Sequence, residues 1–316
     1  RVVDIKFFDS NGQDLSKDAE RGIERVFFRE DFRRVYLDEI GTISYAQHVR
    51  ERYSEAFLDA LDVKAIRKVN PYIVVDFANA PTGEIFTPLL TTLNCRVAAF
   101  NAAVDETKMS IPSKEFQSSL RQLAKICAVL ETAMGVRLDV GGERIFVIDD
   151  QGNIVPGVSL CAAMAVMALK SKGGGVIALP VSMPAVFEEI AAGCGGTILR
   201  TKVNPQALME AANQPDGTLG ADSNNSFIWP EFHPVVDGMM TVTKLLEFLA
   251  TQETTLSQAV SAVPLFHMWQ AEVSCPWENK GTVMRLLNQQ YKERLGEQVD
   301  GVKILQGNSA WVLVLP

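Results

Sequence analysis

The sequence predicts an α/β protein: two similar domains in tandem, with mixed, mostly parallel sheets covered by helices, and a partial C-terminal α+β domain. Two observations predict this class. Continuous apolar runs at 72–77 and 175–180 are each followed by a helical pattern, which is typical of parallel strands buried on both faces. The strand–helix–strand layout over 72–100 also recurs over 175–200, which indicates two domains of one kind.

The elements follow in order from apolar periodicity and from turn residues. Residues 2–8 form a strand-like run and a helix begins near residue 17; a further helix at 45–61 carries apolar residues at helical spacing. The remaining strands are expected at 72–77, 96–100, 136–138, 145–148, 175–180, 197–200, 301–305 and 311–315. The remaining helices are expected at 82–93, 114–134, 158–170, 185–192, 238–250 and 280–295.

These elements divide the chain into four segments. A polar stretch at 64–71 separates a partial first domain, 1–66, from a second α/β domain, 67–171. A third α/β domain covers 172–268 and a partial C-terminal domain covers 269–316. Strand-like runs at both ends of the chain lead us to expect a piece of a longer protein.

Composition excludes several classes of protein. The 316 residues are 47% hydrophobic with a net charge of −8, and a chain without a basic stripe is not expected to bind nucleic acid. The longest apolar stretch, 158–169, is too short to span a bilayer. Five scattered cysteines suit small core residues in a reducing compartment, so we expect a cytoplasmic protein. The three histidines lack metal-ligand spacing.

The candidate site is a charged glycine turn at 138–145, between two apolar runs. The bend holds Asp139, Glu143 and Arg144 together at a strand end. Two carboxylates beside a guanidinium suit an oxygen-rich cation site or a phosphosugar site. The alternative is an ordinary hairpin whose charges face solvent. Neither strand–helix turn carries a dinucleotide-binding or P-loop motif.

With its tandem domains and its final Trp-bearing strand, the chain resembles the α-D-phosphohexomutases, the phosphomannomutase and phosphoglucomutase family. Residues 139–144 match the family's metal loop D-G-D-x-D-R, 220–225 its sugar loop G-E-x-S-G-H, and 5–7 its G-I-K-F run. Residues 236–247 look like the helix that follows the sugar loop. The resemblance implies four domains and transfer of phosphate between the 1- and 6-positions of a hexose phosphate. It places the phosphoserine loop before Arg1, so we expect no catalytic residue in this chain.

The chain departs from this pattern at each site. Gly141 replaces the middle carboxylate of the metal loop. We therefore expect Asp139 and Glu143 to bind Mg²⁺ only weakly and the loop to stay metal-free. Arg144 is then expected to pair with one of these two carboxylates. Ala221 replaces the sugar-loop glutamate, and Asn225 its histidine. In the phosphate loop Leu315 replaces the arginine. The resemblance leaves three expected substrate-binding residues: Arg144, Ser223 and Lys202.

The departures favour a mutase-like module without catalysis of its own and without a cofactor. Residues 29–34 and 275–278 look most like the mutase-like C-terminal region of fused mannose-1-phosphate guanylyltransferase-type nucleotidyltransferases. That resemblance implies a regulatory, assembly or ligand-sensing role. The partners would be an upstream nucleotidyltransferase domain, a hexose phosphate or sugar nucleotide, and a second copy of the chain.

Two alternatives stay open. One is an active phosphomannomutase or phosphoglucomutase that uses Mg²⁺ and whose serine loop is missing from this chain. The other is an unrelated α/β ligand-binding protein.

Overall fold

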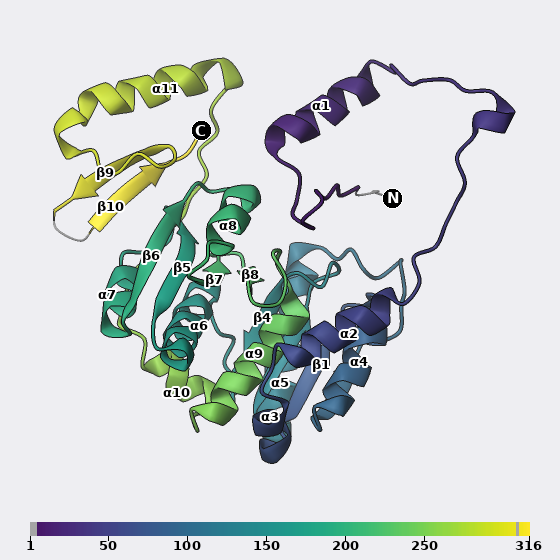
Figure 1. Ribbon diagram of the computed structural model, residues 1–316. Helices are drawn as coiled ribbons and strands as arrows, with labels where there is room; N and C mark the ends of the chain where they lie inside the picture. The colour runs from purple at the N-terminus through teal and green to yellow at the C-terminus, as the bar shows by residue number, and fades with distance from the viewer. Residues whose placement is uncertain (1–4, 308–309) are drawn as a thin grey trace.

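A computed structural model describes residues 5–307 and 310–316, and two four-stranded sheets of identical topology form its centre (Figure 1). In each sheet three strands are parallel and the fourth, at one edge, is antiparallel. The first sheet has the order β2-β1-β3-β4 and the second the order β6-β5-β7-β8. The strands are β1 (Tyr72–Asp76), β2 (Arg96–Phe100), β3 (Met134–Leu138), β4 (Ile145–Ile148), β5 (Gly175–Pro180), β6 (Gly196–Thr201), β7 (Gly217–Ala221) and β8 (Phe227–Ile228). The predicted α/β class with mixed, mostly parallel sheets is confirmed.

Helices cover both faces of the first sheet, which explains why β1 is a continuous apolar run. Ile73 and Val75 face the large core, whereas Val74 faces α5 (Ser113–Leu130) through Leu123. On the core side lie α4 (Thr82–Thr92) and α9 (Gly238–Thr251). Two helices from before the sheet, α2 (Val49–Asp59) and α3 (Val63–Val69), pack beside them.

The second sheet is covered in the same way. Ile177 and Leu179 of β5 face α6 (Gly157–Lys172), and α7 (Val186–Gly193) lies beside α6. Ala178 faces the opposite side, where α8 (Pro205–Ala212) packs. A short helix, α10 (Leu256–Ser261), follows α9 and contacts α6.

The largest buried cluster runs without interruption from one sheet to the other. It contains residues of β1, β3 and β4, of β5 and β7, and of the helices α6 and α9 between them. The two sheets are thus distinct and alike, and one continuous apolar core joins them. The predicted boundary at 171/172 also cuts α6 away from β5 and β7, which it contacts. Periodicity identifies α6 as buried but does not indicate which sheet it covers.

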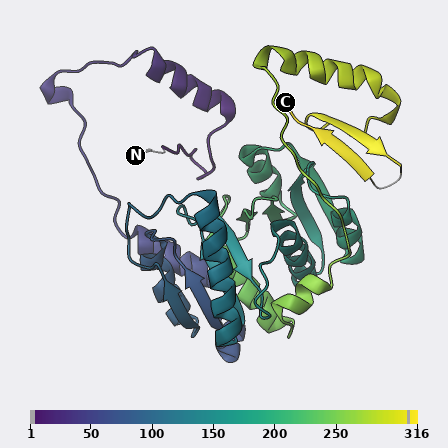
Figure 2. The same ribbon diagram turned by 180° about the vertical axis from the view of Figure 1, so that it is seen from behind.

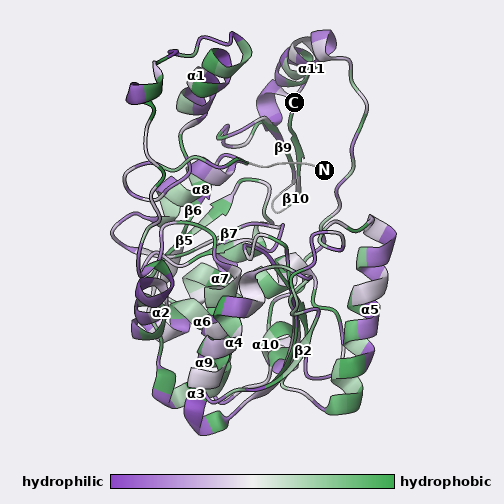
Figure 3. Cartoon of the chain, turned by 90° about the vertical axis from the view of Figure 1, so that its right-hand side faces the viewer, coloured by the Kyte–Doolittle hydropathy of each residue, from purple (hydrophilic) through white to green (hydrophobic). Residues whose placement is uncertain are grey.

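The terminal segments lie outside this core (Figures 1 and 2). At the N-terminal side α1 (Lys17–Phe28) and the short helix η1 (Leu37–Glu39) contain no buried residue, and Figure 3 shows hydrophobic residues on α1. At the C-terminal side α11 (Trp277–Gln290) and η2 (Lys292–Arg294) pack on a hairpin of β9 (Val302–Gln306) and β10 (Ala310–Val314).

Several predicted bounds need correction. Residues 2–4 of the predicted first strand lie outside the described residues, and Phe8 forms only an isolated bridge with Asp14. The helix predicted at 45–61 begins at Val49, after His48 in the left-handed region. The polar stretch 64–71 is mostly α3, which buries Ile66. All five cysteines are free, and none of the described helices is long and apolar enough to cross a membrane.

Candidate functional site

The predicted metal and sugar loops lie against each other at the carboxyl ends of β3 and β7. Main-chain pairing joins Arg144 to Ser226, and the amide of Ile145 donates to the carbonyl of Asn225 at 3.3 Å. In open α/β sheets, ligands bind outside the carboxyl ends of the strands. The structure therefore brings the loop that holds Asp139, Glu143 and Arg144 next to the loop that holds Ser223.

Two helix N-termini fix the position of these loops. The amide of Gly238, the first residue of α9, donates to the carbonyl of Gly142 at 2.8 Å. A Cβ at Gly238 would lie 2.7 Å from that carbonyl oxygen, so the close approach requires glycine. At the start of α6, a Cβ on Gly157 would meet the Asn225 side-chain oxygen at 2.6 Å. The two buried helices thus position both loops.

Asp237 caps α9 and links it to α2. Its Oδ1 accepts a hydrogen bond from the amide of Met240 at 2.8 Å, and its Oδ2 accepts one from the hydroxyl of Tyr53 at 2.7 Å. Burial raises the pKa of Asp237 to about 6, while these hydrogen bonds act in the opposite direction. Burial and the nearby Asp237 carboxylate also raise the pKa of Tyr53.

A buried ion pair lies at the same end of the first sheet, between Asp76 at the end of β1 and Arg137 of β3. Their side chains are only 6% and 7% exposed. Asp76 also accepts hydrogen bonds from the amide of Ala78 and the side-chain amide of Asn101, each at 2.9 Å. Because the carboxylate is paired and hydrogen-bonded, these interactions offset the free-energy cost of removing it from water.

Within the metal loop, the carboxylates of Asp139 and Glu143 are already engaged. Asp139 Oδ1 accepts from the amides of Glu143 and Arg144 at 2.8 and 3.1 Å. The Glu143 carboxylate forms an ion pair with the ammonium of Lys6. Among the described residues Lys6 pairs with Glu143 and Arg144 contacts Asp139 through its amide, so the expected pairing of the Arg144 side chain with Asp139 or Glu143 is not found there.

These residues do not fit a Mg²⁺ ion. Mg²⁺ prefers several oxygen ligands in an octahedral arrangement, and Gly141 supplies no carboxylate. One oxygen of Asp139 is saturated by backbone amides, and Glu143 faces an ammonium. Over residues 5–307 and 310–316, no cluster of three His, Cys, Asp or Glu side chains has the arrangement of a metal site.

Lys202 lies apart from these loops. It follows β6, the edge strand, which is separated from β7 by β5. Neighbouring strands lie about 4.8 Å apart, so β6 and β7 are about 10 Å apart. The amide of Val203, the next residue, donates to Asp300 of the C-terminal segment at 2.9 Å. Lys202 thus lies near that segment, whereas Arg144 and Ser223 belong to the two loops that contact each other.

The replaced motif positions have different environments. Ala221 is fully buried in the large core, where it contributes no hydrogen-bond acceptor. Leu315 is exposed near the end of the chain, after β10. Tyr53 belongs to no sequence motif that could have pointed to the site. Lys6 belongs to a predicted family motif, but the sequence does not predict its ion pair.

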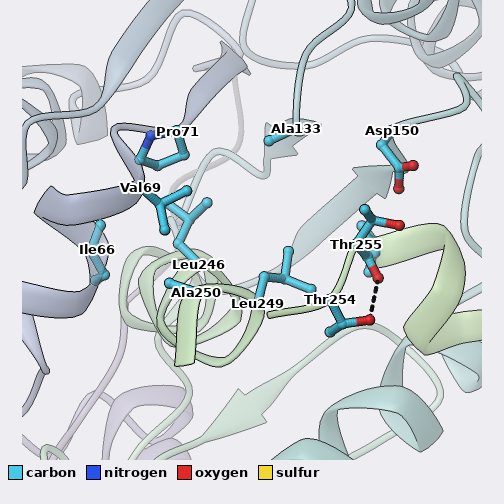
Figure 4. Close-up of a pocket in the computed structure, with 11 residues that line it drawn as sticks. Ile66, Val69, Pro71, Ala133, Asp150, Leu246, Leu249, Ala250, Thr254 and Thr255 are labelled. Atoms are coloured by element: carbon cyan, nitrogen blue, oxygen red, sulfur yellow. Dashed lines mark hydrogen bonds between the residues drawn. The ribbon is translucent and has the colours of Figure 1, made fainter. Parts of the chain in front are cut away.

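A cavity of about 210 Å³ lies at the other end of the first sheet (Figure 4). Pro71 and Ala133, which precede β1 and β3, line it together with Leu246 and Leu249 of α9. The walls are largely apolar, and Asp150 at the rim is hydrogen-bonded to Ser257. The cavity therefore offers few polar groups for a phosphosugar, and the loops remain the better candidate site.

Comparison with known proteins identifies the family of the chain. The profile "Phosphoglucomutase/phosphomannomutase, alpha/beta/alpha domain II" matches residues 51–152, and the corresponding domain III profile matches residues 156–266. Together they cover roughly two-thirds of the chain. The chain belongs to the α-D-phosphohexomutase family. The matched ranges place α6 and α9 in domain III, although α9 also packs on the first sheet.

Similar proteins extend this match over nearly the whole chain. A phosphoglucomutase/phosphomannomutase of Thermococcus kodakarensis is 29% identical over 98% of this chain and 68% of its own length. A probable phosphoglucosamine mutase of Methanopyrus kandleri is 27% identical over 99% of this chain and 68% of its own. The chain thus spans about two-thirds of these phosphohexomutase relatives.

Solved structures of phosphohexomutases share the fold. A phosphoglucomutase/phosphomannomutase family protein from Burkholderia thailandensis superposes with a TM-score of 0.73 at 19% identity, over 94% of this chain and 62% of its own. A putative phosphomannomutase from Thermus thermophilus gives 0.73 at 17% identity, over 98% and 68%. The names of these four proteins mention no guanylyltransferase, so the fusion stays a prediction.

Proposed function

We propose that this chain is the hexose-phosphate-binding part of a phosphohexomutase, which moves phosphate between the 1- and 6-positions of a hexose. The similarity to mutases over 98% of the chain, together with the contact between the loops at 139–144 and 220–225, carries the proposal. The phosphorylated serine that such transfer requires would come from outside residues 1–316. Mg²⁺ has no role in this proposal, because the loop does not fit it.

Three residues would contact the ligand. Arg144 is exposed beside the sugar loop, and a guanidinium donates two parallel hydrogen bonds to a phosphate. Ser223, half-buried in the adjoining loop, offers a hydroxyl that donates to and accepts from a sugar hydroxyl. Lys202 would contact only a ligand that extends towards the C-terminal segment.

A second candidate function is a non-catalytic module of a sugar-nucleotide enzyme of the mannose-1-phosphate guanylyltransferase type. The specific observation that favours it is the metal loop, where Gly141 supplies no ligand and Lys6 pairs with Glu143. An upstream nucleotidyltransferase domain or a second copy of the chain would then be the partner, and the ligand would be a hexose phosphate or sugar nucleotide. Both functions suit the cytoplasm, where these substrates are made.

Binding and turnover separate the two functions. Calorimetric titration with glucose 1-phosphate and mannose 1-phosphate should give binding that Arg144→Ala weakens by about 10- to 150-fold, the equivalent of a charge-assisted hydrogen bond. Arg121→Ala, an exposed arginine on α5, is the matched control and should leave affinity unchanged.

A coupled mutase assay of the full-length protein follows. Turnover that Arg144→Ala abolishes supports the mutase, and binding without turnover supports the non-catalytic module. Absence of binding to either sugar phosphate would reject the mutase.

A further inference from the structure

We propose that the ammonium of Lys6 supplies the positive charge of the loop at 139–144 in place of a divalent cation. The proposal concerns this loop alone and holds whether or not the chain binds a hexose phosphate. The ion pair between Lys6 and Glu143 joins residues 137 positions apart in the sequence, so it is a tertiary contact.

A compact turn presents Lys6 to the loop. The amide of Leu15 donates to the carbonyl of Phe7 at 3.1 Å, and Asp9 Oδ1 accepts from the amides of Asn11 and Gln13. These bonds fold residues 7–15 back on themselves directly after Lys6. The lysine is therefore held by an ordered segment, which lowers the entropy lost in forming the pair.

Side chains of the protein bring positive charge to the loop without a metal. Asp139 and Glu143 contribute two negative charges, and Lys6 and Arg144 two positive ones. Asp14 is a further acidic group nearby: burial raises its pKa, while Lys6 lowers it and Glu143 raises it. A divalent cation would have to displace the Lys6 ammonium from Glu143 or share that carboxylate with a like charge.

Gly141 is the position at which a third carboxylate can be added. A Cβ there would meet Glu143 at 3.5 Å, an ordinary van der Waals contact, and the backbone is not left-handed. Gly141→Asp would thus add a carboxylate next to Glu143 with no clash at its Cβ. By contrast, Gly142 has φ +71° and is unsuitable for substitution.

Zero-length carbodiimide cross-linking tests the contact directly, because it joins an amine to a carboxylate only where the two touch. Mass spectrometry of the wild-type chain should find a Lys6–Glu143 amide whose yield is unchanged by millimolar Mg²⁺. Absence of this amide, or its suppression by Mg²⁺, would overturn the proposal. Lys108, whose ammonium lies 3.1 Å from Asp105, is the internal control.

Titration with Mn²⁺ then tests the competition. The double variant Gly141→Asp/Lys6→Ala should bind Mn²⁺ about tenfold or more tightly than Gly141→Asp alone, because a positive charge beside the ion is gone. Gly141→Asp/Lys108→Ala should match Gly141→Asp. Equal affinity of the Lys6 and Lys108 double variants would contradict the proposal, as would Mg²⁺ binding by the wild type that Asp139→Ala removes.

Discussion

The loss of stability caused by Tyr53→Phe should depend on pH, because the hydroxyl of Tyr53 donates a hydrogen bond to the titratable side chain of Asp237. The pKa of Asp237 is about 6 in the folded state, against the ordinary aspartate value of 3.8 in the unfolded chain. The folded state therefore holds the proton more tightly, so this group contributes stability that is fully present below about pH 4 and lost as the pH rises through about 6.

The cost of Tyr53→Phe follows from the charge of the acceptor. Near pH 7 the hydroxyl donates to a carboxylate at 2.7 Å, and loss of such a bond costs about 1.5–3 kcal/mol of unfolding free energy. Near pH 4.5 Asp237 is protonated, and the weaker bond between neutral groups is worth about 0.5–1.5 kcal/mol. The variant should also raise the pKa of Asp237 further, because the Tyr53 hydrogen bond lowers it.

Urea unfolding near pH 7 and near pH 4.5 measures both values. Tyr72→Phe is the control, since the Tyr72 ring lies under Arg96 and its hydroxyl makes no hydrogen bond within the described part of the chain. The two pH values should give clearly different losses for Tyr53→Phe and equal, small ones for Tyr72→Phe. Equal losses for Tyr53→Phe at both pH values would refute the reasoning.

Three further substitutions test the core. Lys244→Met should cost about 3–5 kcal/mol in chemical unfolding, because its buried ammonium lies 3.1 Å from Glu247, whose carboxylate is only 11% exposed and would lose this partner; a loss below about 1 kcal/mol would contradict this. Gly135→Ala would drive a methyl group into the Cys127 thiol and should cost about 1–3 kcal/mol, with partial recovery in Gly135→Ala/Cys127→Ala. Ala250→Leu should fill part of the apolar cavity and add about 0.5–2 kcal/mol, seen as a higher thermal midpoint; a lower midpoint would show that the cavity wall is already close-packed.

The sequence predicts those elements whose burial is continuous or strictly periodic. Strand β2 was expected at 96–100 and lies there, and α6 is apolar on all sides and buried as expected. Helix α3 could not be predicted, because Ile66 is its only buried residue in an otherwise polar stretch. Strand β8 is only two residues long, too short for a periodic signal.

The candidate site was predictable in part for a related reason. Asp139, Glu143 and Arg144 are close in sequence, so a turn brings them together whatever the tertiary fold. Their contact with the sugar loop depends on how the two similar sheets pack together with α6 and α9. The repeated strand–helix pattern predicts the two sheets but not this packing. The ion pair with Lys6 spans 137 positions and has no local signal at all.

The packing also decides which parts of the site can move. Loops 139–144 and 220–225 are bridged to each other, and the buried N-terminus of α9 holds the first of them through Gly238 and Gly142. Helices α1 and α11, by contrast, bury no residue, and segments with few buried contacts open at low free-energy cost. The terminal segments carry Lys6 and Leu315. Movement of the N-terminal segment away from the loop at 139–144 would have to break the Lys6–Glu143 ion pair, which therefore contributes to its energetic cost.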